Sequence, residues 1–166
     1  MSRRGSRTRA RLIGTTGALL ILIGITACDF DAGVPRLKSI DADEMATALD
    51  DEELRLVDGW AFGQAFQQDN AFVGKPNVYA RYDGAPDTIE TTRNHPPGPT
   101  YSAFSPTTCD SVAGESVRHK NLGFSCVPGL RLFESHRGTP GDLQSVTALI
   151  LGDGVSAHLY VNIEGT

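Results

Sequence analysis

The feature that most constrains this chain is an apolar run near its N-terminus, at residues 12–25. Five arginines and no acidic residue precede this run. A membrane-spanning helix needs roughly 20 apolar residues, whereas this run has 14 and contains three glycines. A basic segment followed by a short apolar one is the pattern of a signal peptide. Removing residues 1–27 leaves 139 of the 166 residues, which is the size of one domain.

The apolar run ends in Ile25, Thr26, Ala27 and Cys28. An aliphatic residue, two small residues and a cysteine at this place resemble the lipobox of bacterial lipoproteins. The resemblance implies cleavage before Cys28 and lipidation of its thiol with diacylglycerol, so that the membrane is a partner through this lipid. Two acyl chains anchor a protein stably, and the expected location is the extracytoplasmic face of the cell membrane. An ordinary secretory signal or an uncleaved anchor is the alternative interpretation.

The mature chain is strongly acidic. All five arginines of the signal leave with residues 1–27, so that 10 Lys/Arg remain against 20 Asp/Glu, a formal charge of −10. A surface of this charge is repelled by phosphate backbones. We therefore expect no nucleic-acid partner.

Lipidation of Cys28 leaves Cys109 and Cys126 as an even pair in an oxidising compartment. We expect a disulfide between them, and two free buried thiols are the alternative. The spacing of these cysteines and of the four histidines does not match a metal site. We predict no metal and no cofactor.

The mature sequence predicts an α+β fold with a short N-terminal helical region, followed by an antiparallel sheet with long loops. Residues 28–38 are expected to be a lipidated tether, and residues 39–166 a single domain. A capping-box pattern at Asp41 and Glu44 predicts a helix over residues 42–49. Residues 146–151 and 155–163 flank a glycine-containing turn and predict a hairpin. We also expect residues 88–92 to be extended, and residues 101–104 and 122–127 to be strands.

Two groups of side chains are candidates for a binding surface. Trp60, Phe62 and Phe66 lie in an aromatic-rich stretch, and the last two are expected to share a helix face. Packing in the core is the simpler interpretation of this stretch. His158 and Tyr160 belong to a polar row on the last predicted strand, between Ser156 and Asn162. The alternative for this row is a solvated sheet face.

No catalytic signature stands out in the sequence. A Gly-x-Ser-x-Gly nucleophile elbow, a phosphate-binding loop and a dinucleotide-binding motif are all missing. We therefore expect a non-catalytic module of the cell envelope that binds a partner protein or a small apolar ligand. A small envelope hydrolase and a purely structural envelope component are the alternatives.

Overall fold

The computed structural model describes residues 36–68, 74–127, 129–138 and 145–165. The predicted signal peptide, Cys28 and most of the predicted tether lie outside these residues. The elements follow in the order β1 (Leu37–Ile40), α1 (Ala42–Asp51), β2 (Trp60–Gln68), β3 (Asn77–Gly84), α2 (Thr88–Arg93), β4 (Ser105–Pro106), α3 (Ala113–Arg118), the 3₁₀ turn η1 (Lys120–Leu122), β5 (Arg131–Arg137), β6 (Val146–Gly152) and β7 (Ala157–Ile163).

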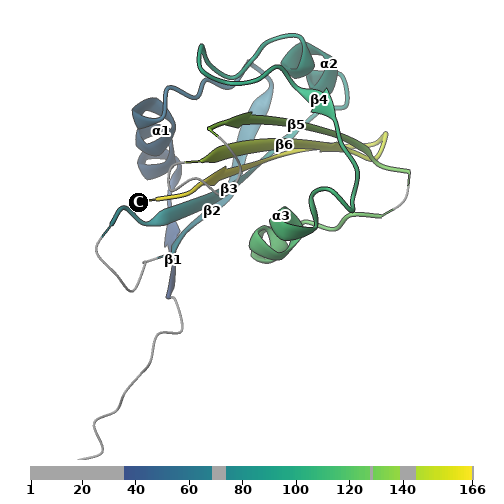
Figure 1. The fold of residues 1–166 in the computed structure, drawn as a ribbon. Coiled ribbons are helices and arrows are strands. Elements are labelled where there is room, and N and C mark those ends of the chain that lie inside the picture. The colour runs from purple at the N-terminus through teal and green to yellow at the C-terminus, as the bar shows by residue number, and fades with distance from the viewer. Residues whose placement is uncertain (1–35, 69–73, 128, 139–144, 166) are drawn as a thin grey trace, which may run out of the picture. The chain divides into compact units, whose positions relative to one another are not determined.

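One antiparallel sheet of seven strands forms the centre of the fold, in the order β1-β2-β3-β7-β6-β5-β4. The strands β6 and β7 form the predicted hairpin and pair from Val146 opposite Ile163 to Gly152 opposite Ala157. The last strand therefore lies in the middle of the sheet, between β6 and β3. Helices α1 and α2 lie on one side of this sheet and α3 on the other (Figure 1).

Helix α1 coincides with the helix predicted over residues 42–49, and extends it to Asp51. The Asp41 carboxylate accepts hydrogen bonds from the backbone N–H groups of Asp43 and Glu44, at 3.1 and 2.9 Å. The Glu44 carboxylate in turn accepts the Asp41 N–H at 3.2 Å. This reciprocal capping box satisfies donors that the first helical turn leaves unpaired.

Three local expectations are wrong. Residues 88–92 form helix α2 because Thr88, Ile89 and Thr92 bury one side against the sheet, which outweighs the strand preference of β-branched residues. Leu122 is the last residue of the 3₁₀ turn η1 and residues 123–127 are irregular, so residues 122–127 form no strand. Residues 101–104 form no strand either. Tertiary packing, and not local strand preference, determines the secondary structure of these segments.

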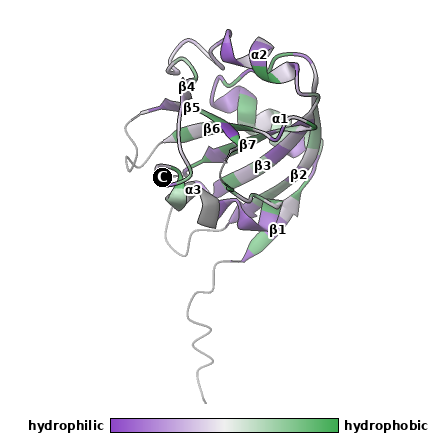
Figure 2. Ribbon diagram, turned by 90° about the vertical axis from the view of Figure 1, so that its right-hand side faces the viewer, coloured by the Kyte–Doolittle hydropathy of each residue, from purple (hydrophilic) through white to green (hydrophobic). Residues whose placement is uncertain are grey.

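The sheet buries both of its faces. The face covered by α1 and α2, called the α1 face here, packs Met45, Leu49 and Ile89 against alternate residues of the strands. The opposite face, called the α3 face, packs Val112, Leu122 and Phe124 against the strands. Every residue of β6 is buried, as expected for a strand covered on both sides. In Figure 2 α2 appears as a hydrophilic helix with a hydrophobic band, consistent with a helix that covers a core on one side only.

A β-bulge at Gly63 divides the aromatic stretch between the two faces. Phe62 pairs with Tyr82 and Gln64 with Arg81, so that β2 gains one residue between them. A Cβ on Gly63 would lie 2.8 Å from a carboxylate oxygen of Asp83, which explains why the bulge is formed by glycine. The extra residue reverses the alternation of side chains that follow it.

Cys109 and Cys126 form a disulfide, with their Cα atoms 5.6 Å apart. The bond closes residues 109–126, called the cross-linked segment here, which carries α3 and η1 over the sheet. Both sulfurs belong to the partly buried rim of the α3-face core. Among the described residues, none of the helices has the length and apolar character needed to cross a membrane.

Candidate functional site

The five residues predicted as one binding surface lie at three places. Trp60 and Phe62 pack against the α1-face core, whereas Phe66 packs against the α3-face core. The bulge at Gly63 is the physical cause of this division, because without it all three side chains would share one face. The prediction that Phe62 and Phe66 share a helix face is wrong, since both belong to strand β2.

The indole of Trp60 is tied into the fold. Its Nε1–H donates to the Thr92 hydroxyl of α2 at 2.9 Å, and that hydroxyl donates to the Thr88 carbonyl at 2.7 Å. The Phe62 ring packs edge-on against Tyr82, with centroids 5.8 Å apart. These contacts describe core packing between β2, β3 and α2.

His158 and Tyr160 lie together on the α3 face, where β7 pairs with β3. His158 stands opposite Asp83 in the register and Tyr160 stands opposite Arg81. The His158 Nδ1 lies 2.7 Å from a carboxylate oxygen of Asp83. Because a carboxylate only accepts, Nδ1 carries the proton, and in the neutral ring Nε2 is left as an acceptor.

Arg81 connects this pair to the cross-linked segment. Its Nε lies 3.1 Å from one carboxylate oxygen of Asp83, and its Nη2 donates to the other at 3.3 Å. Its Nη1 donates to the Leu122 carbonyl at 2.9 Å. The guanidinium thus holds both the carboxylate that orients His158 and the turn η1 that lies over the strands.

Ser156 and Asp153 complete the polar network at the β6–β7 turn. The Ser156 hydroxyl lies 3.3 Å from His158 Nε2 and 3.2 Å from a carboxylate oxygen of Asp153. A hydroxyl has one proton, so it donates to only one of these acceptors at a time. The Asp153 carboxylate also accepts the backbone N–H groups of Val155 and Ser156, at 2.8 and 2.7 Å. These hydrogen bonds hold the Asp153 pKa below its usual value.

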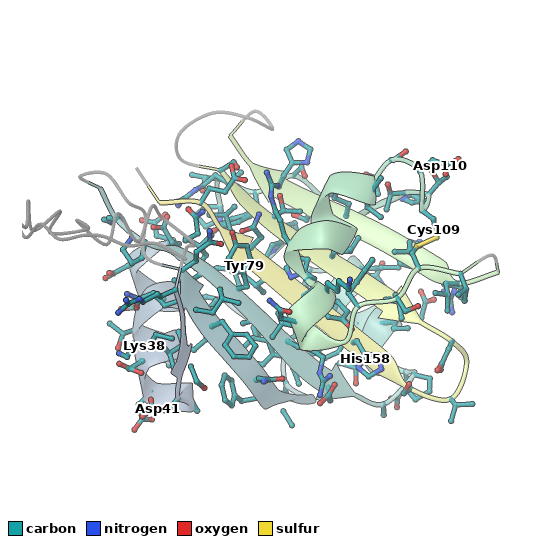
Figure 3. All side chains as sticks on the ribbon, turned by 90° about the horizontal axis from the view of Figure 1, so that it is seen from below. Lys38, Asp41, Tyr79, Cys109, Asp110 and His158 are labelled. Carbon is teal, nitrogen blue, oxygen red and sulfur yellow. A yellow bond between two sulfur atoms is a disulfide. The ribbon has the colours of Figure 1, made fainter. Side chains whose placement is uncertain are left out.

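This network borders an open groove of about 270 Å³, called the His158 groove here. Its polar wall includes Arg81, Asp153 and His158, and its apolar wall includes Leu130 and Leu151. Figure 3 shows the α3 face toward the viewer, with His158 and Tyr79 on either side of α3. The remaining lining residues are Gly123, Ser125, Val127 and Tyr160.

An adjoining hollow of about 520 Å³ extends the groove toward the disulfide. It is lined by Cys109 and Cys126 and shares Val127 and Leu130 with the His158 groove. The Val127 side chain is 51 % exposed, one of three large hydrophobic residues exposed within the described ranges. The combined groove presents an apolar strip at one side and hydrogen-bonding groups at the other, the composition typical of ligand sites.

An aromatic cluster forms the floor beside the groove. His119 of the cross-linked segment is fully buried, with its ring centroid 5.3 Å from Tyr160, 6.1 Å from Tyr79 and 6.2 Å from Phe124. Burial raises the pKa of Tyr160 to about 12, so its hydroxyl keeps its proton at neutral pH. The cluster packs the cross-linked segment against β3 and β7 through aromatic ring contacts.

The sequence did not reveal Arg81, Asp83, Val127 or Asp153 as members of a site. In the sequence, Asp83 and Gly84 fit a turn that follows a strand, and acidic residues are common throughout the chain. Only the pairing of β3 with β7 brings Asp83 opposite His158. A sequence signal was present for Asp153 alone, within the glycine-containing turn.

No family model, curated protein or solved structure matches this chain. In the part of the chain that the structure describes, no three His, Cys, Asp or Glu side chains are grouped to hold a metal ion.

Proposed function

We propose that this protein is a lipoprotein of the cell envelope, anchored through a lipid on Cys28 at the extracytoplasmic face, and that its α+β domain of residues 39–166 binds a partner. The His158 groove and the adjoining hollow are the binding site. The occupant is an extended segment of an envelope protein, whose apolar side chains contact Val127 and Leu130 while its polar groups bond to His158 and Ser125. The anchor rests on the lipobox resemblance alone.

The observation that carries the binding role is that the exposed side chain of Val127 and the half-buried Leu130 lie beside an ordered polar network in one groove. Arg81, Asp83 and His158 are held by one another, so they lose little conformational entropy when a ligand binds. The exposed side chain of Val127 offers apolar surface, and a partner that buries this surface removes it from water. An exposed apolar side chain beside a preorganised polar network favours a binding role over a purely structural one.

Photo-crosslinking tests the groove. A benzophenone amino acid at Val127 is expected to capture a partner in native membranes, whereas one at Thr91, exposed on α2, is not. His158→Ala should reduce the crosslink from Val127, because it removes the hydrogen-bonding end of the groove. Trp60→Phe, on the α1 face, should leave the crosslink unchanged. Equal capture from Val127 and Thr91 would contradict the proposal. A crosslink from Val127 that His158→Ala does not weaken would also contradict it.

Mass spectrometry of the mature N-terminus tests the anchor separately. The expected terminus is a diacylglyceryl-modified Cys28, and an unmodified Cys28 would exclude the lipoprotein assignment.

A hydrolase is the second candidate, because Ser156, His158 and Asp83 follow the order of a nucleophile, a base and an orienting carboxylate. Acyl transfer also needs N–H donors for the developing oxyanion. The backbone N–H groups of Ser156 and of its neighbour Val155 already donate to the Asp153 carboxylate. That negative charge beside the serine opposes formation of an oxyanion, so the geometry favours binding.

A fluorophosphonate reagent distinguishes the two candidates. We expect no covalent labelling of the folded protein, since Ser156 lacks a site that stabilises the transition state. The unsubstituted protein could instead be labelled, and the labelling could disappear in both Ser156→Ala and His158→Ala. That result would favour the hydrolase over the binding role. Trypsin-like serine hydrolases of known reactivity serve as the positive control for the reagent.

A further inference from the structure

A second hollow lies on the α3 face, on the other side of η1 from the His158 groove. It measures about 290 Å³ and is called the β1 hollow here. Leu37, Phe66 and Leu122 give it apolar walls, and Tyr79 contributes an aromatic ring. Turn η1 separates the two openings, since Leu122 lines one and Gly123 the other.

The strand register explains why these side chains meet. Phe66 pairs with Ser39 on one side and with Tyr79 on the other, so these residues form a row across β1, β2 and β3 on the α3 face. Leu37 and its partner Gln68 form the next row on that face. The hollow therefore lies at the β1 edge of the sheet, beside the point where the described chain begins.

Polar side chains line the rim of the hollow. The Tyr79 hydroxyl donates to the Gln68 side-chain oxygen at 3.2 Å and accepts from the Asn77 amide at 3.3 Å. Arg118 pairs with Glu164 at 2.8 Å, while its side chain remains 42 % exposed. Tyrosines and arginines with an apolar body and a polar end suit the boundary between hydrocarbon and water.

We propose that the β1 hollow binds an acyl chain and glycerol region of a bilayer lipid from the membrane that holds the protein. This inference rests on the proposed anchoring at Cys28. Leu37 follows Cys28 by nine residues, and nine extended residues span at most about 30 Å. Leu37 therefore lies within about 30 Å of the anchoring membrane, where lipid is the most abundant amphipathic molecule.

Leu37 is the first apolar residue of the described chain and one of its most exposed large hydrophobic residues. Leu37 is 43 % exposed, whereas Ile40, which belongs to the α1-face core on the other side of β1, is 6 % exposed. Covering Leu37 and Phe66 with an acyl chain removes apolar surface from water. The mature charge of −10 disfavours anionic headgroups, so the lipid expected here is zwitterionic or neutral.

Fluorescence quenching by lipid tests the proposal. The lipidated protein carries Phe66→Trp in a Trp60→Phe background and is reconstituted into phosphatidylcholine vesicles whose acyl chains are brominated. Bromine quenches tryptophan on contact, so emission from the Phe66→Trp reporter should fall by more than half. In a separate sample, the unsubstituted protein serves as the control. Its single tryptophan, Trp60, is bonded to Thr92 on the opposite face and should keep its emission in the same vesicles.

A matched pair of surface variants identifies the hollow as the cause. Leu37→Glu places a charge in the hollow wall and should restore most of the reporter emission. Val155→Glu, at a side chain that is 85 % exposed in the β6–β7 turn, should not. Circular dichroism and thermal unfolding verify that each variant keeps the fold.

Vesicle flotation separates the possible outcomes. A reporter quenched no more than Trp60, in protein that floats with the vesicles, overturns the lipid site and leaves the anchor intact. Protein that does not float overturns both the anchor and the lipid site. Quenching that persists in Leu37→Glu also overturns the assignment to the β1 hollow.

Discussion

Replacing both Cys109 and Cys126 by serine is expected to lower the free energy of unfolding by about 3 kcal/mol, because the closed loop restricts the unfolded chain. The cysteines are 17 residues apart, a loop of moderate length. The segment between them contributes Val112, Leu122 and Phe124 to the α3-face core. Its release should also expose the aromatic floor and increase the binding of a hydrophobic dye.

Denaturant unfolding with and without a reductant measures this effect. The unsubstituted protein should lose stability when reduced, and the double serine variant should be insensitive to the reductant. Because the cross-linked segment walls both the His158 groove and the β1 hollow, reduction should weaken capture from Val127 as well. A stability that the reductant does not change would contradict a structural role of the bond.

The second large effect is expected at the centre of β6. Leu149 packs in the α3-face core and Ile150 in the α1-face core, and both side chains are fully buried. Leu149→Ala and Ile150→Ala should each destabilise the protein by about 2–5 kcal/mol through lost burial and a residual cavity. The exposed control Val155→Ala should stay within about 0.5 kcal/mol of the parent.

Combining these variants with reduction tests the two-faced core. In the reduced protein the cover of the α3 face is loosened, so Leu149→Ala should cost less than it does in the oxidised protein. Ile150→Ala should cost the same in both, because the α1 face does not contain the disulfide. Interaction energies of this kind arise between groups that share a core and vanish between independent sites. If reduction changed the cost of Leu149→Ala and of Ile150→Ala by the same amount, the assignment of these residues to two separate cores would be contradicted.

The structure confirms the predicted elements whose sequence pattern depends on neighbouring residues, and it corrects those that depend on distant contacts. The β6–β7 hairpin follows from alternating residues around a turn, and the start of α1 follows from the capping box at Asp41, both of which involve neighbours in sequence. Helix α2 was missed because Ile89 and Thr92 gain burial only when the sheet is already in place. A six-residue segment is too short for its own propensity to decide its structure.

The candidate surface shows the same limit. His158 and Tyr160 share a face by strict alternation, which the sequence already indicates. Trp60 and Phe66 were grouped because they are close in sequence, yet a single extra residue at Gly63 directs them to opposite faces. Such a bulge depends on contacts with Asp83 and Arg81 of the neighbouring strand, which are not visible in the local pattern.

The sequence by itself determined the final hairpin and supplied the cysteine pair that forms the disulfide. It also predicts a signal peptide and a lipidated Cys28, and removal of residues 1–27 would leave a strongly acidic chain. These properties depend on composition or on residues close together along the chain. The tertiary structure alone decided which side chains meet at the His158 groove and the β1 hollow. The physical reason is that β7 inserts between β3 and β6, and only this pairing brings Asp83, separated by 75 residues from His158, into hydrogen-bonding distance.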